Sequence, residues 1–117
     1  MTIYPGQADE MIRNIRMLGN SLEEVNEEQA EEMGLVAETW WVQRQVGATK
    51  LIFMIEAPDP PKSMELFHRS DAPIAIWLRN QLKNRTTYNP VDLREIDFDE
   101  GDREGLEVLV TWSRRLD

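Results

Sequence analysis

The sequence predicts an α+β fold in which a split β-α-β arrangement forms an antiparallel sheet with helices on one face. Three observations lead to this prediction. An apolar stripe at helical spacing follows a short β-prone start, two β-prone runs are separated by a two-residue turn, and further helix starts precede a final alternating run. At 117 residues, 41% of them hydrophobic, the chain has the size of one domain with one core. We therefore expect residues 1–117 to form a single domain.

A short strand and a long helical segment open the chain. Residues 2–4 are β-prone and end at Pro5-Gly6, after which acidic residues are available for the first turn of a helix. Ser21-x-x-Glu24 is typical of a capping box, so the segment forms either two helices or one kinked helix, and Gly34 ends it. Apolar residues in a 4-3-4-3 spacing make one stripe along it: Met11, Ile15, Leu18, Leu22, Val25 and then Met33.

Two strands follow as a predicted hairpin. Residues 35–45 and 48–57 are rich in Val, Ile, Thr, Trp and Phe, contain no proline and are separated by Val46-Gly47. A connection this short can join only an antiparallel pair of strands. The hairpin is therefore the centre of the predicted sheet.

Adjacent tryptophans occupy the first of these strands. Because side chains alternate across a strand, Trp40 and Trp41 must point to opposite faces of the sheet. Trp41 is in phase with Leu35 and Ala37, and we expect it on the side covered by helices. Trp40 is then expected on the open side.

The second strand of the hairpin is apolar on both faces. Leu51, Phe53 and Ile55 share one face, whereas Ile52 and Met54 share the other. The helices can cover only one face, and the simplest cover for the other is the same face of a second copy. We therefore expect a homodimer.

The second half of the chain predicts two helices and a closing strand. Asp59-Pro60-Pro61 and Ser70-Asp71-Ala72-Pro73 are both typical of helix starts. Residues 91–98 are expected to be extended and residues 99–105 to form a polar turn, while residues 106–113 alternate as a strand does. The predicted order is strand, helix, strand, strand, helices, strand.

Four stretches resemble the dimeric α/β-barrel superfamily of ferredoxin-like proteins, over about residues 2–113. They are residues 3–11 (IYPGQADEM), 39–43 (TWWVQ), 51–57 (LIFMIEA) and 70–74 (SDAPI). The resemblance is nearest to small uncharacterised bacterial members, and it implies a barrel made by two sheets that face each other in a dimer. Members of this superfamily include cofactor-independent monooxygenases, heme-degrading enzymes, muconolactone isomerases and stress-responsive proteins, so the resemblance implies no single activity.

Composition excludes several classes of function. The formal net charge of -9 would repel nucleic acid and anionic membrane surfaces, so we expect neither as a partner. The chain has no cysteine, which removes thiolate chemistry and disulfides, and it shows neither a signal peptide nor an apolar run of membrane-spanning length. We expect a cytoplasmic protein.

Candidate chemistry is sparse. His68 is the single histidine, and it is expected to be either a half-buried structural residue or the acid/base of a pocket. One histidine cannot make a multi-histidine metal centre, and the acidic run 97–104 does not fit a calcium loop, because Gly101 falls where a ligand is needed. We predict no metal and no cofactor.

An aromatic set points to ligand binding. Aromatic residues from several elements should converge between the sheet and the helices, where a small apolar or aromatic ligand could bind. The expected functions are a homodimeric barrel protein that binds such a ligand or, alternatively, a cofactor-independent monooxygenase or isomerase using His68, or an acidic module that binds partners through residues 23–32. The candidate ligand-binding residues are Tyr4, Trp40, Phe53, Phe67, Trp77 and Trp112.

Overall fold

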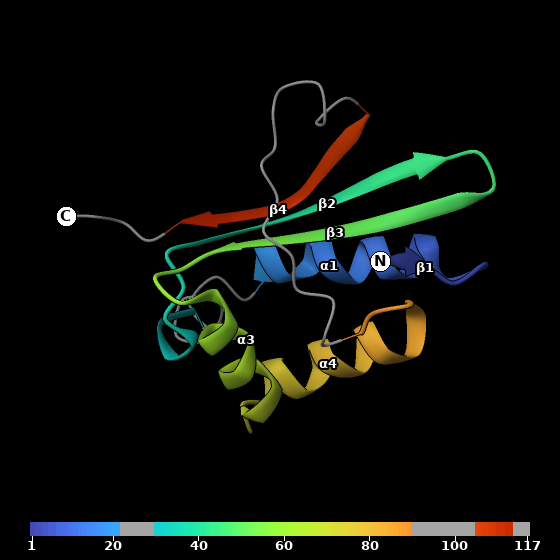
Figure 1. Cartoon of the computed structure of the whole chain (residues 1–117). Coiled ribbons are helices and arrows are strands. Elements are labelled where there is room, and N and C mark those ends of the chain that lie inside the picture. Colours follow the sequence, from blue (N-terminus) through green and yellow to red (C-terminus); the bar gives the residue numbers. More distant parts are fainter. Residues whose placement is uncertain (22–29, 90–104, 114–117) are drawn as a thin grey trace.

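The computed structural model describes residues 1–21, 30–89 and 105–113. Its elements confirm the predicted α+β class and the predicted order along the chain (Figure 1). They are β1 (Thr2–Ile3), α1 (Ala8–Ser21), β2 (Ala37–Gln45), β3 (Ala48–Glu56), α3 (Pro60–Arg69), α4 (Pro73–Arg85) and β4 (Leu106–Ser113). Within the described residues, no helix is long and apolar enough to cross a membrane.

In the described part of the chain the strands form a four-stranded sheet in the order β1-β3-β2-β4, with antiparallel neighbours throughout. Because β1 and β2 are both antiparallel to β3, they run parallel to each other on either side of it. A helix, α1, connects them along the chain, and this is the predicted split β-α-β arrangement. The last strand, β4, pairs on the far side of β2, so β1 and β4 lie at opposite edges.

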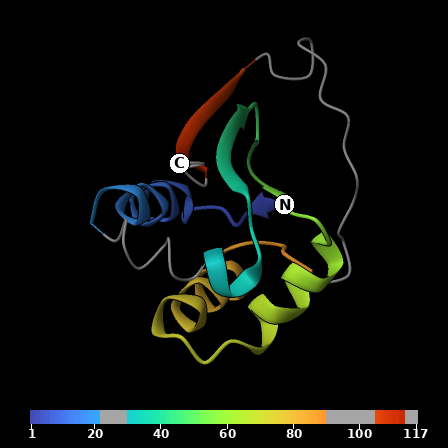
Figure 2. The same cartoon turned by 90° about the vertical axis from the view of Figure 1, so that its left-hand side faces the viewer.

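The two edge strands of the sheet, β1 and β4, differ in what lies along their outer sides. Beside β1 runs the end of α4 and the chain that follows it: Ile3 forms a bridge with Thr86, and the Tyr4 N–H donates to the Arg85 carbonyl at 2.8 Å. No strand of the described residues pairs with the outer side of β4. The helices α1, α3 and α4 lie together on one side of the sheet (Figures 1 and 2).

Local sequence explains where the elements begin and end. The Asp59 carboxylate accepts from the Lys62 N–H at 3.2 Å and caps α3, as predicted. Gly34, with φ +72°, follows the helical turn of residues 30–33, and Gly47, with φ +81°, lies in the tight turn between β2 and β3. Both glycines adopt the left-handed backbone that glycine favours.

The two tryptophans face opposite sides of the sheet, but the predicted assignment is reversed. Trp40 is fully buried in the core with Leu35 and Val110, whereas Trp41 lies beside Thr39 on the open face and is 8% exposed. The prediction counted alternation from Leu35, but β2 begins only at Ala37 and the chain bends at residue 36. Alternation holds only inside a strand, so the count was out of phase.

An irregularity in the pairing of β2 with β4 lies beside these tryptophans. Trp40 pairs with Val110, but its neighbour Trp41 pairs with Val108, so Leu109 is the extra residue of a β-bulge. The bulge changes which β4 side chains reach the open face. Two predicted segments, the extended run 91–98 and the acidic run 97–104, lie outside the described residues, as does most of the acidic stretch 23–32.

Candidate functional site

The structure brings most of the predicted ligand-binding aromatics together in the core between the sheet and the helices. Trp40 and Phe67 are buried there, and Phe53, Trp77 and Trp112 pack against the same cluster. Trp40 and Phe53 stack with their ring centroids 4.2 Å apart. Tyr4 is not in this cluster and is 43% exposed. These contacts make the five aromatics part of the core, and a ligand role for them stays a prediction.

His68 is held by a neighbouring tyrosine. Its Nε2 lies 2.9 Å from the Tyr88 hydroxyl, and its ring contacts Phe67 edge-on. Burial and then the positive charge of Arg79 lower the pKa of His68, while burial raises the pKa of Tyr88 to about 12. Both groups are therefore neutral near pH 7, and the half-buried position agrees with a structural role. Acid/base catalysis by His68 stays a prediction.

A carboxyl group that sequence reasoning missed lies on the helix side of the sheet. Glu38 stands between Ile55 of β3 and Trp112 of β4 in the strand register. Burial raises its pKa to about 7, although the Trp40 indole N–H lies close enough to favour the charged form. That N–H makes no hydrogen bond of ordinary geometry to any described residue. Glu38 lies two residues before Trp40 in β2 and therefore shares its face, and only the strand register shows that this face is the helix side.

The open face of the sheet is apolar in its centre and charged at its ends. Along β3, Lys50, Ile52, Met54 and Glu56 share this face, since they alternate with core residues such as Leu51. On β4, Val108 pairs with Trp41 of β2 on the same face and is 53% exposed. The charged pair, Lys50 and Glu56, therefore brackets the apolar centre from opposite ends of β3.

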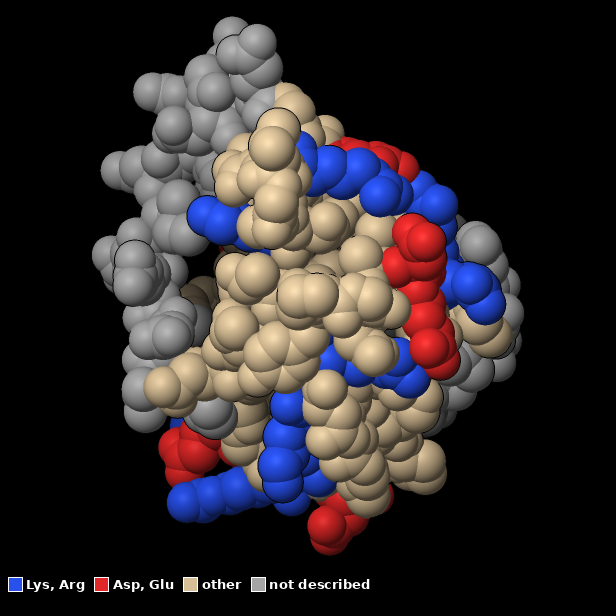
Figure 3. Space-filling model, turned by 90° about the vertical axis from the view of Figure 1, so that its right-hand side faces the viewer, with Lys and Arg blue, Asp and Glu red and all other residues tan. Residues whose placement is uncertain are grey.

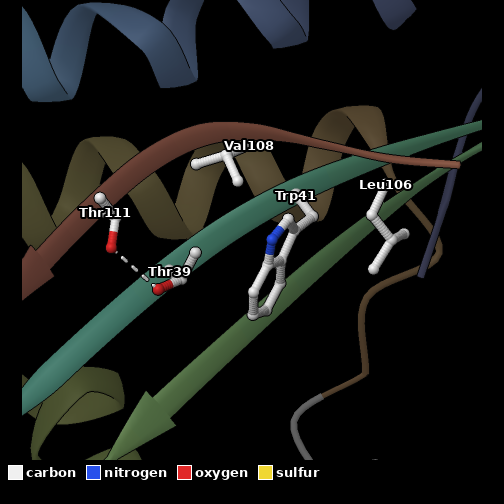
Figure 4. A pocket seen from close by; sticks show the side chains of 5 residues that line it. All are labelled: Thr39, Trp41, Leu106, Val108 and Thr111. Atoms are coloured by element: carbon white, nitrogen blue, oxygen red, sulfur yellow. Dashed lines mark hydrogen bonds between the residues drawn. The ribbon is translucent and has the colours of Figure 1, made fainter. Parts of the chain in front are cut away.

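A hollow of about 360 Å³ lies on this open face, between β2 and β4 (Figure 4). Trp41, Leu106 and Val108 supply apolar walls, and two threonines supply hydroxyl groups. The Thr39 and Thr111 Oγ1 atoms lie 3.2 Å apart and share a hydrogen bond. The five described lining residues carry no ionisable group, so their side chains can bind an uncharged molecule by contact and by hydrogen bonding.

Other polar groups tie elements together. Figure 3 views the end of the molecule that carries the β2–β3 turn, the start of α1 and the end of α4, where basic and acidic side chains lie near one another around uncharged ones. Arg85 joins α4 to α1 by pairing with Glu10 at 3.0 Å. Arg16 of α1 pairs with Glu107 of β4. Among the described residues, no three His, Asp or Glu side chains are grouped as a metal site would need.

Comparison with protein-family models, with curated proteins and with solved structures found no match. The fold and the candidate site define the class only: a small α+β protein whose antiparallel sheet has helices on one side and a partly apolar face with a hollow on the other.

Proposed function

We propose that this chain acts as a homodimeric α/β-barrel protein in which the open faces of two sheets pack against each other. The observation that carries the proposal is the apolar centre of that face. Ile52 and Met54 are partly exposed there and Val108 is 53% exposed, although all three lie on the central strands or beside them. Burying such a face against an identical one removes apolar surface from water on both copies.

The charges at the two ends of β3 favour a second copy as the occupant. Lys50 and Glu56 are six residues apart, which is about 20 Å along a strand. If two sheets face each other with their β3 strands running in opposite directions, each Lys50 comes near Glu56 of the partner subunit. A single surface thus supplies both members of the pair, which is what a two-fold symmetric interface requires.

The first test is the mass of the protein in solution. The wild-type chain should be a dimer at micromolar concentration by native mass spectrometry and light scattering. Val108→Glu should make it monomeric, because the substitution places a carboxylate inside the interface.

A matched control separates this effect from a general change in surface charge. Ile76 on α4 is another β-branched residue, 41% exposed, on the helix side of the molecule. Ile76→Glu should leave the dimer intact. A monomeric wild-type protein, or a dimer unaffected by Val108→Glu, would refute the proposal.

A further inference from the structure

We propose that the hollow of Thr39, Trp41, Leu106, Val108 and Thr111 binds a small, flat, uncharged aromatic molecule that carries one hydroxyl or carbonyl group. This inference rests on the proposed dimer, because the sheet of the second copy would face the hollow that these described residues line and supply its roof.

The length of the hollow along β2 indicates the size of ligand that it can hold. A volume of about 360 Å³ lies near the lower end of the range of small-molecule sites, roughly 300 to 1,000 Å³. Along β2, the hollow extends from the Thr39–Thr111 pair to the Gln43–Leu106 pair, which is four residues of strand or about 13 Å. One ring or two fused rings fit within this length.

The walls of the hollow favour an aromatic ring. In Figure 4 the Trp41 indole of β2 and the Leu106 side chain of β4 lie on the same side of the sheet. Val108 is also on β4, two residues after Leu106. An indole and two branched aliphatic side chains make favourable contacts with a flat apolar ring. The aromatic part of the ligand is therefore assigned to the end of the hollow that Leu106 closes.

The two threonines define the other end. One hydroxyl of the Thr39–Thr111 pair donates to the other, so the accepting hydroxyl keeps its own proton free and both oxygens keep lone pairs. The pair can therefore donate to a ligand carbonyl or accept from a ligand hydroxyl. A ligand carboxylate would find no cation among the five lining residues and would lose hydration when the second sheet covered it.

The experiment uses 2-naphthol and 2-naphthoate as probes and isothermal titration calorimetry on the full chain. Wild-type protein should bind 2-naphthol and should bind 2-naphthoate at least tenfold more weakly. Thr111→Val keeps the shape of the side chain and removes one hydroxyl, so it should weaken 2-naphthol binding about fivefold. Trp41→Leu should abolish binding.

The controls address folding and the dimer separately. Val46→Thr, in the exposed β2–β3 turn, should leave binding unchanged, and circular dichroism should show each variant folded. A dimeric wild-type protein that does not bind 2-naphthol, that binds 2-naphthoate equally well, or whose binding is unchanged by both Thr111→Val and Trp41→Leu would overturn the ligand assignment and leave the dimer standing. A monomeric wild-type protein would overturn the proposed function itself.

Discussion

Among the described residues, Glu38 occupies an unusual environment for a carboxyl group. Its side chain lies on the helix side of β2, level with Ile55 and Trp112, and burial raises its pKa to about 7. In the unfolded chain the same carboxyl has an ordinary pKa of about 4.5. Between these two values the folded protein holds a proton that the unfolded chain has released.

This difference makes stability depend on pH. Because the pKa of Glu38 is raised in the folded protein, this residue contributes to the free energy of unfolding at low pH. The contribution is fully present below about pH 4.5 and is lost as the pH rises through about 7. The pKa change from 4.5 to about 7 sets an upper limit of about 3.4 kcal/mol on this loss. Glu38→Gln cannot ionise, so at pH 8 the variant should be more stable than wild type, and at pH 4 the two should be similar. Urea unfolding of both proteins at pH 4 and pH 8, at a fixed protein concentration, measures this difference in stability.

The control for Glu38 is an exposed carboxylate. Glu32 lies on the surface, and Glu32→Gln should shift the stability curve little at any pH. Parallel pH profiles for wild type and Glu38→Gln would show that folding does not raise the pKa of Glu38.

At the scale of elements, the corner between α3 and α4 depends on one side chain. The Arg79 guanidinium of α4 donates to the Phe67 carbonyl and to the Ser70 carbonyl, each at 2.7 Å. These oxygens lie at the end of α3, where backbone carbonyls have no partner within the helix. Arg79 therefore joins the two helices, and its charge also contributes to the lowered pKa of His68.

Replacing this arginine tests both effects. Arg79→Met should destabilise the protein by about 2 kcal/mol, because partly buried carbonyls lose charged donors. It should also raise the pKa of His68 toward the ordinary value, and the chain's single histidine makes that NMR titration unambiguous. Lys83→Met, an exposed position on the same helix, is the matched control. Equal stability of the two variants would contradict the joining role.

At the scale of the whole molecule, the distribution of charge defines one orientation for the dimer. With opposed β3 strands, Lys50 of each copy lies near Glu56 of the partner subunit, whereas with strands running the same way like charges would meet. Charge reversal distinguishes the two arrangements.

Lys50→Glu and Glu56→Lys should each weaken dimerisation roughly tenfold at low salt, because each variant brings like charges together at two symmetric places. The double variant should regain most of the wild-type affinity. Sedimentation equilibrium measures the dissociation constants, and Lys62→Glu on α3 controls for net charge. If the double variant is weaker than either single one, the proposed orientation is wrong.

The class of fold and the order of the elements follow from local patterns in the sequence. Asp59 with its prolines, Gly34 and Gly47 act on the backbone within a few residues, and they mark where helices and turns occur whatever the rest of the chain does. The apolar residues on both faces of β3 were equally readable, since alternation belongs to any strand.

The packing of the folded chain sets which residues each face of a strand meets. It placed Trp40 in the core and Trp41 on the open face, reversing the prediction, and it put Glu38 on the helix side, where loss of hydration raises its pKa. The hollow depends on Thr39 meeting Thr111, 72 residues away, across a pairing that contains a bulge. A one-residue shift in register exchanges the two faces of a strand, and the register between distant strands is set by the packing of the whole sheet, which no local stretch of sequence contains.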